Sequence, residues 1–273
     1  GLRAGRRKWR GARQSIAVAL VVAAAAGCAY RLPAALETEL RPGGRPLVVG
    51  LGDGLAGDLA AGLHENGTKF AGVSGVAADR ADCGLFDPTR VRDRSAAEHT
   101  KPAACAGWAE SWTLELRATR PEAVVLHLGR DAAQSVLDGT WKTACDPVYR
   151  ERYLALLDRA LTLIEREAPG AAVVVLNERL DNNSADPIDT ACFNQRIKEF
   201  ADTHQGRVRL ADFDAYVCPN GACRTGLPGG KPFYTGLDVA RLTPQAQRFV
   251  VPWIEEQVSA ARAARTNPPG GPR

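Results

Sequence analysis

The sequence has no CxxC pair, and its four histidines, His64, His99, His127 and His204, are scattered along the chain. Structural zinc sites are built from closely spaced cysteine and histidine ligands. The absence of that spacing excludes the common zinc-binding motifs. We therefore expect neither a metal nor a cofactor.

The folded part of the chain also lacks an excess of basic charge. Methionine is absent, and lysine supplies only 6 of the 35 basic residues. The net charge is +4, but six basic residues and no acidic one lie within residues 1–14, which leaves 29 basic and 31 acidic residues beyond them. A nucleic-acid-binding protein carries its basic excess on the folded body. Nucleic acid is therefore not an expected partner.

An apolar stretch, Ile16–Tyr30, follows the basic residues directly. A basic flank followed by an apolar segment is typical of a signal sequence or membrane anchor whose basic side stays in the cytoplasm. We predict a cytoplasmic flank at 1–14, an anchor or signal segment at 15–36 and a linker at 37–46. The expected location is the cell membrane, with one N-terminal anchor and the domain facing outside. The alternatives are a secreted protein and a lipoprotein modified at Cys28.

Six cysteines lie beyond the apolar stretch, an even number that suits disulfides in an exported protein. The segment from Cys218 to Cys223 reads CPNGAC, a turn-forming sequence that a local disulfide would close. Six cysteines allow 15 pairings. The pairings we favour are Cys218 with Cys223, Cys83 with Cys105, and Cys145 with Cys192.

Short valine-rich runs alternate with helical patterns along the chain. Such alternation predicts an α/β domain whose mostly parallel sheet is covered on both faces. We predict a flavodoxin-like three-layer sandwich with about five strands over 47–263, followed by a disordered tail at 264–273. The predicted strands lie at 47–50, 69–75, 123–129, 171–177 and 207–213. The predicted helices are Gly54–Leu63, Cys105–Thr119, Pro147–Glu167, Asp189–His204 and Pro244–Ala263.

Ligands of such sheets bind beyond the carboxyl ends of the strands. This edge should bring together Gly52–Gly54, the segment 76–104, Gly129–Asp138 and the turn before Pro244. The segment 76–104 is too long for a simple connection, and long loops at this edge commonly shape a binding site.

The first strand runs into a tight elbow, LVVGLGDGLAGDL at 47–59, and further motifs follow it in order. They are CGLF, CAGWAESW, VVLHLGRDAAQSVLDGTW, DPVYRERYLALLDRAL, FNQRI and DVARLTPQAQRFVVPWI. Over residues 46–258 the chain resembles the SGNH/GDSL hydrolase superfamily, and most closely the SGNH domain that is fused to actinobacterial acyltransferase-3 membrane proteins. The resemblance implies an esterase or acyl-transfer fold. In that family a serine attacks an acyl carbonyl, and a histidine, oriented by an aspartate, acts as the base.

The resemblance assigns site positions in this chain. Asp53 matches the first-block aspartate, and Gly54 stands where the serine is expected. Asp238 matches the last-block aspartate, but Arg241 stands where the histidine is expected. The second-block glycine is Gly75 or Gly84, and Gly129-Arg130 matches the third block. Position 132, where the family has its oxyanion asparagine, is alanine.

The resemblance therefore implies a degenerate triad. Glycine has no oxygen to attack with, and arginine stays protonated and cannot accept a proton. We expect a pseudoenzyme that binds an envelope glycan or acylated saccharide, or that supports a membrane acyltransferase partner. The alternative is an active O-acyl esterase or O-acetyltransferase that acts on envelope saccharides with substitute catalytic residues.

Several substitutes and other uses of the site stay open. Ser74, Ser135 or a free Cys83 could be a nucleophile, with His99 or His127 as its base. The pattern Gly52-x-Gly54-x-x-Gly57 fits a weak dinucleotide motif, with Asp79 as the ribose acid. Arg241 could pair with Asp238, or could bind an anionic or polyol ligand together with Arg130. The aromatic candidates for stacking on a sugar are Trp108, Trp112 and Trp141.

Overall fold

The computed structural model describes residues 39–76, 82–86, 89–180, 185–235 and 241–266. The predicted anchor, Cys28, Asp79, Asp238 and residues 267–273 of the predicted tail lie outside these ranges. None of the helices within them is long and apolar enough to span a bilayer.

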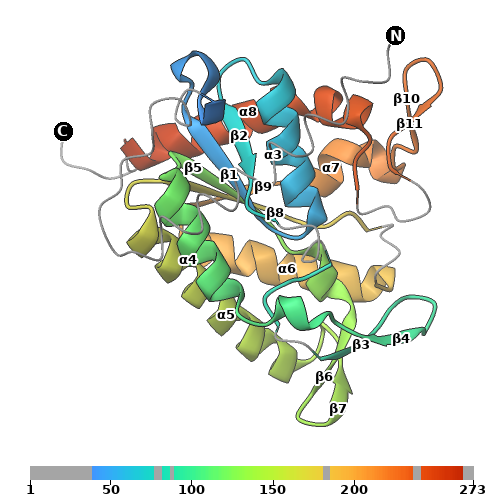
Figure 1. Ribbon diagram of the computed structural model, residues 1–273. Helices are drawn as coiled ribbons and strands as arrows, with labels where there is room; N and C mark the ends of the chain where they lie inside the picture. The colour runs from blue at the N-terminus through green and yellow to red at the C-terminus, as the bar shows by residue number, and fades with distance from the viewer. Residues whose placement is uncertain (1–38, 77–81, 87–88, 181–184, 236–240, 267–273) are drawn as a thin grey trace.

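A five-stranded sheet forms the centre of the domain (Figure 1). Its order is β2-β1-β5-β8-β9, and every neighbouring pair is parallel. Renumbered by sequence, this is the 2-1-3-4-5 order of flavodoxin-like folds. The prediction of fold class and strand number is therefore confirmed. The strands are β1 (Leu47–Gly52), β2 (Ala71–Ser74), β5 (Ala123–His127), β8 (Ala172–Leu176) and β9 (Val208–Ala211).

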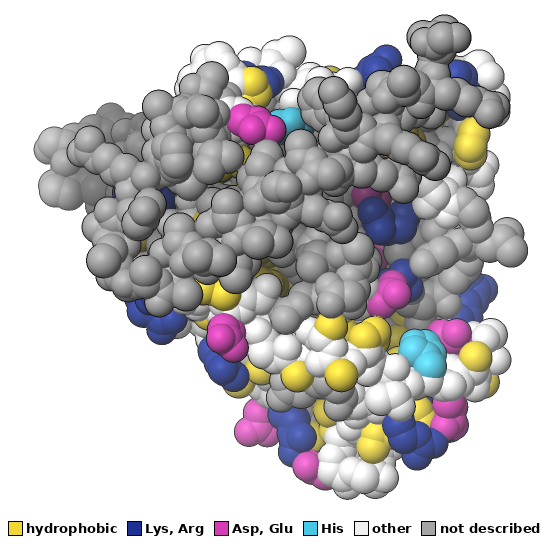
Figure 2. Space-filling model, in the orientation of Figure 1, with side chains coloured by type: hydrophobic (Ala, Val, Ile, Leu, Met, Phe, Trp, Pro, Cys, Tyr) yellow, Lys and Arg dark blue, Asp and Glu magenta, His cyan; other side chains and the backbone are white. Residues whose placement is uncertain are grey.

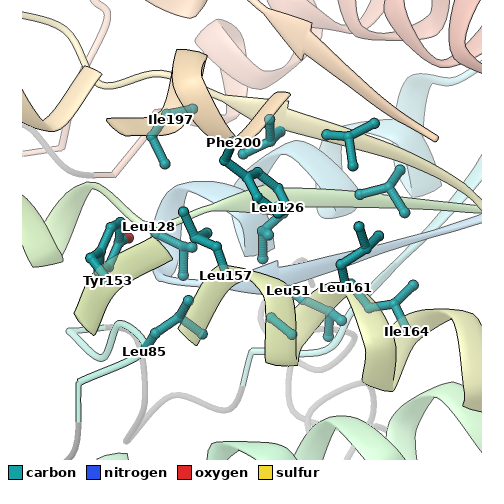
Figure 3. Packing of buried hydrophobic residues seen from close by; sticks show 14 of the residues in the cluster. Leu51, Leu85, Leu126, Leu128, Tyr153, Leu157, Leu161, Ile164, Ile197 and Phe200 are labelled. Carbon is teal, nitrogen blue, oxygen red and sulfur yellow. The ribbon is translucent and has the colours of Figure 1, made fainter. Parts of the chain in front are cut away.

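Helices cover both faces of this sheet. On one face, α3 (Gly54–Asn66) and α8 (Pro244–Thr266) bury a cluster that includes Val48, Val125 and Val174. On the other face, α4 (Trp108–Thr119), α5 (Pro147–Glu167) and α6 (Pro187–Thr203) bury a second cluster. This cluster contains the residues of β1, β5 and β8 that alternate with those of the first cluster. Figure 3 shows Leu157 and Leu161 of α5 packed towards Leu126 of β5 in this second cluster. The short helix α7 (Phe213–Val217) follows β9.

The helix bounds follow local sequence signals. Helix α5 begins at Pro147 after the N-cap Asp146 and ends at Glu167, as predicted, because proline at the first position favours helix initiation. Helix α8 continues to Thr266, three residues past its predicted end. Asp186 caps α6 by accepting from the N–H of Ile188, so this helix begins two residues earlier than predicted.

A second sheet lies at the carboxyl edge of the first, where we predicted only loops. Its antiparallel order is β4-β3-β6-β7, with strands of three or four residues. One face of it is buried through Val91, Ser135 and Leu137. The described residues of segments 76–104 and 129–138, together with β7, therefore form an ordered lobe. Its strands are β3 (Arg90–Arg92), β4 (Glu98–Thr100), β6 (Gln134–Leu137) and β7 (Thr140–Lys142).

Shorter elements complete the chain. The hairpin strands β10 (Gly226–Leu227) and β11 (Lys231–Pro232) pair with each other. In the part of the chain that the structure describes, four 3₁₀ turns connect the larger elements. These turns are η1 (Pro42–Gly44), η3 (Ala103–Cys105), η4 (Gly129–Ala132) and η5 (Pro219–Gly221).

The structure contains the three disulfides that we favoured: Cys83–Cys105, Cys145–Cys192 and Cys218–Cys223. The first joins the lobe to the start of α4, and the second joins the segment before α5 to α6. The predicted linker also contacts the domain, since the guanidinium of Arg41 donates to both carboxylate oxygens of Glu122 at 2.7 Å.

Candidate functional site

The elbow between β1 and α3 has the tight geometry expected from its sequence. Gly52 has a φ of +112°, and a Cβ there would lie 1.9 Å from the carbonyl oxygen of His127, so only glycine fits. Asp53 follows as the N-cap of α3, and its Oδ1 accepts from the N–H of Leu55 at 3.1 Å. Gly54 is the first residue of the helix and is buried.

Asp53, His127 and Glu178 form a buried row across the carboxyl ends of three adjacent strands. His127 Nδ1 lies 2.7 Å from Asp53 Oδ1, and His127 Nε2 lies 3.4 Å from Glu178 Oε2. The side chains of Asp53, His127 and Glu178 are 4%, 2% and 8% exposed. The row thus places two carboxyl groups on either side of one imidazole, away from solvent.

Burial and the neighbouring charges shift the pKa values of His127 and Glu178 in opposite directions. Burial alone would lower the pKa of His127, but the carboxylates of Asp53 and Glu178 outweigh it, so the pKa of His127 is raised. Burial also raises the pKa of Glu178, and the neighbouring His127 only partly offsets this. His127 therefore favours its charged form, and Glu178 gives up its proton less readily than an exposed glutamate.

Arg241 lies beside the first turn of α3. Its guanidinium donates from Nε and Nη2 to the two carboxylate oxygens of Asp58, at 2.9 and 2.7 Å. Asp58 is one turn beyond Gly54 and also accepts from the N–H of Leu242. Arg241 and Leu242 therefore contact α3 one turn beyond the elbow. Asp238, the partner that we considered for Arg241, lies outside the described residues.

Gly129 and Arg130 also reach the elbow. A Cβ at Gly129 would lie 1.5 Å from Glu178 Oε2, so the glycine makes room for this carboxyl group. The N–H of Arg130 donates to Asp53 Oδ2 at 3.3 Å. The Arg130 guanidinium lies 2.7 Å from a carboxylate oxygen of Asp82.

The two candidate glycines of the second block, Gly75 and Gly84, line one small hollow beside Gly52. Gly84 lies against the carboxylate of Asp131, which is fully buried. That carboxylate accepts from Lys101 Nζ and from the N–H of Leu85, both at 2.6 Å. This ion pair joins Lys101, just after β4, to the turn that carries Gly129 and Arg130.

The substitute nucleophiles are not joined to a histidine. Ser74 Oγ contacts Val76, and Ser135 is buried in the second sheet, where its Oγ faces Ala133. Cys83 is in a disulfide and has no free thiol. His99 is exposed on β4. Within the described ranges, no serine hydroxyl is hydrogen-bonded to a histidine ring.

Packing accounts for the dinucleotide-like glycines and for two of the tryptophans. Gly57 packs on Ser74. The carboxylate of Asp53 accepts from the N–H of Leu55 at the start of α3, a donor that a bound phosphate would otherwise need. Trp108 and Trp112 are each 5% exposed and pack edge to face, with ring centroids 4.8 Å apart, so they are core residues. Trp141 is partly exposed on the lobe beneath the guanidinium of Arg92.

Several residues of the site were not predicted. Glu178 and Arg179 lie just beyond β8, after Asn177, at the carboxyl edge of the sheet, and this position was a usable signal. Arg179 is 3% exposed and lies over the ring of Tyr234. No local pattern marks the other residues, which come from distant segments. They are Asp58, Asp82, Lys101 and Asp131.

No protein-family model matches the chain, and no curated protein is significantly similar to it. Twelve solved chains match in structure. The periplasmic domain of a Salmonella ser. Paratyphi A lipopolysaccharide acetyltransferase has a TM-score of 0.47 and 12% identity, over 84% of this chain and 90% of that one. A salicylyl-acyltransferase from a tetracycline biosynthetic pathway has a TM-score of 0.42 and 14% identity, over 79% and 55%.

A third match is a carbohydrate esterase family 2 enzyme with its carbohydrate-binding domain, from Corynascus thermopiles (Myceliophthora fergusii). It has a TM-score of 0.44 and 16% identity, over 80% of this chain and 67% of that one. These identities and TM-scores are too low for the activity of any of the three to be transferred to this chain.

Glu115 on α4 gives a first testable prediction. Its side chain packs against Gly75, and among the described contacts its carboxyl group has no hydrogen-bond or ion-pair partner. Burial raises its pKa from 4.5 to about 7. Between these two pH values the folded protein keeps a proton that the unfolded chain has released, so stability falls as the pH rises and stays lower above pH 7.

Glu115→Gln should therefore be nearly neutral at acidic pH and stabilising at alkaline pH, by about 2 kcal/mol after allowance for partial exposure. Urea unfolding at about pH 5 and pH 8.5 measures the difference. Glu110→Gln, at an exposed position on the same helix, is the control and should show no such pH dependence. Equal effects of Glu115→Gln at both pH values would contradict the prediction.

Proposed function

We propose that this domain binds a neutral, O-acylated envelope saccharide at the β1–α3 elbow without cleaving it. One observation carries the proposal. Gly54 opens α3, and Arg241 is held to Asp58 one turn further along the same helix. The two positions that the resemblance assigns to a nucleophile and a base thus lie at one helix end.

Neither residue can perform that chemistry. Gly54 has no side-chain oxygen. The guanidinium of Arg241 stays protonated and donates to Asp58, so it cannot accept a proton from a nucleophile. Loss of a single member of such a triad lowers the rate by several orders of magnitude. What remains is an elbow with ordered backbone and polar groups, which suits binding.

The charges at the elbow favour a neutral ligand over an anionic one. His127 lies between two carboxyl groups, Arg130 pairs with Asp82, and Arg241 pairs with Asp58. On the face seen in Figure 2, the coloured basic and acidic side chains likewise lie next to one another. A phosphate or carboxylate would have to compete with these internal partners, whereas hydroxyl and ester groups would not.

The proposal includes an extracytoplasmic location and an acyltransferase partner in the membrane. Three disulfides support the location, because they persist in oxidising compartments. The anchor and the partner rest on the N-terminal sequence and on the resemblance alone.

Calorimetric titration with acetylated xylo-oligosaccharides, their de-acetylated forms and oligogalacturonates tests the proposal. We expect the acetylated neutral oligomers to bind best. Arg130→Ala should abolish binding, because this residue lies at the elbow. Arg117→Ala is the matched control, since Arg117 also pairs with one carboxylate but lies near the far end of α4. Binding that prefers oligogalacturonates, equal losses in both variants, or no binding to any probe would overturn it.

A further inference from the structure

The buried row of Asp53, His127 and Glu178 does more than fill space beneath the elbow. Asp53 is bonded to three groups at once: His127 Nδ1 and the N–H groups of Leu55 and Arg130. The imidazole therefore acts, through one carboxylate, on both the first turn of α3 and the Gly129–Arg130 turn.

The groups around the imidazole come from four elements. Asp53 approaches from the elbow, Glu178 from the end of β8, and Arg130 from η4 with an opposing positive charge. Phe213 of α7 packs edge to face with the ring at 6.2 Å and offers no charge. Arg179, next to Glu178, donates its N–H to Glu178 Oε1. The side chain of His127 is therefore shielded from solvent, with only 2% of its surface exposed.

We propose that His127 is a positioning residue of the candidate site: its imidazolium holds Asp53 and Glu178 in place, and ligand binding at the elbow weakens when that charge is removed. The part that concerns ligand binding rests on the proposed function.

The geometry gives the reason. His127 Nδ1 is hydrogen-bonded to Asp53, whereas Nε2 faces Glu178 at 3.4 Å without a hydrogen bond. A neutral imidazole has only one N–H, so it cannot present a proton to both carboxyl groups. The other ring nitrogen then presents a lone pair to a buried carboxyl group, and the two carboxylates lose the cation between them. An uncompensated buried charge is unfavourable, so Glu178 would have to move or take up a proton. Glu178 Oε2 fills the space directly over Gly129, so its movement would remove a packing contact of the turn that carries Arg130.

Three measurements on the full chain between about pH 6 and pH 10 test the role of His127. The first follows the ring by NMR, and we expect it to titrate above the usual range for histidine. The second follows amide hydrogen exchange at Leu55 and Arg130, where protection should fall by about tenfold as the ring loses its proton. The third measures affinity for acetylated xylo-oligosaccharide, which should fall over the same pH range.

Two variants separate positioning from a purely structural role. Glu178→Gln keeps the shape of the side chain but removes its charge, so the ring transition and the loss of amide protection should both move to lower pH. His204→Gln is the control, because the imidazole of His204 also contacts one carboxylate, Asp158, at 2.7 Å but lies far from the elbow in sequence and at the end of α6. It should change neither.

A ring that stays neutral at pH 6, or amide protection that does not follow the ring, would overturn the inference. So would a transition that Glu178→Gln leaves unmoved. If the wild type binds none of the saccharides, the proposed function fails, while the NMR and exchange measurements still decide whether His127 positions the elbow.

Discussion

Replacing Lys101 with methionine should destabilise the protein by about 3 to 5 kcal/mol, as expected for the removal of one partner from a buried ion pair. The side chains of Lys101 and Asp131 are 3% and 0% exposed, and their charged atoms are 2.6 Å apart. Methionine fills similar space but leaves the carboxylate of Asp131 without its cation. Urea unfolding followed by tryptophan fluorescence measures the loss.

The double variant Lys101→Met/Asp131→Asn distinguishes charge from packing. Asparagine still offers an oxygen to the N–H of Leu85 but carries no charge, so the double variant should be more stable than Lys101→Met alone. In the single variant, Asp131 can be accommodated by taking up a proton, so the destabilisation should be smaller at pH 4 than at pH 8. A double variant no more stable than the single one would contradict this account of the pair.

Removal of the Cys145–Cys192 disulfide by Cys145→Ser/Cys192→Ser should cost about 4 kcal/mol, because it closes a long loop in the unfolded chain. The two cysteines are 47 residues apart and join the segment before α5 to α6. Chemical unfolding of the purified variant under non-reducing conditions measures this loss.

The Cys218–Cys223 disulfide is the matched control. It spans only 5 residues, so the same loop-entropy argument gives a loss of about 2 kcal/mol for Cys218→Ser/Cys223→Ser. An equal or larger loss in this second variant would show that loop closure in the unfolded chain is not the main contribution.

The main sheet could be predicted because its signals are local. The three central strands, β1, β5 and β8, are short valine-rich runs bounded by breakers, and the helices between strands begin at recognisable caps such as Asp146-Pro147. The second sheet could not be predicted in this way. Its strands have three or four residues, and its one buried face is supplied by isolated residues such as Val91 and Leu137. In strands this short, too few residues alternate between buried and exposed for the two-residue period of a strand to be recognised in the sequence.

The residues of the candidate site likewise fall into those with a local sequence signal and those without one. Asp53, Gly129 and Arg130 could be placed at the elbow because they follow predicted strands. His127 was considered as a substitute base; it is buried, and its two carboxyl partners come from segments far apart in sequence. Asp58 and Lys101 gave no signal, because an ion pair between distant segments leaves no pattern in the chain. Pairing across the fold, rather than local propensity, decides which charges the elbow holds.

Release of acetate from acetylated xylo-oligosaccharide by the purified full chain tests directly whether the domain only binds the ester or also cleaves it. We predict binding of the oligosaccharide with no release above the rate in buffer, because Gly54 and Arg241 provide neither a nucleophile nor a base. Release that disappears in Ser74→Ala, Ser135→Ala or His99→Ala would contradict the claim, and would show instead an active esterase with substitute catalytic residues.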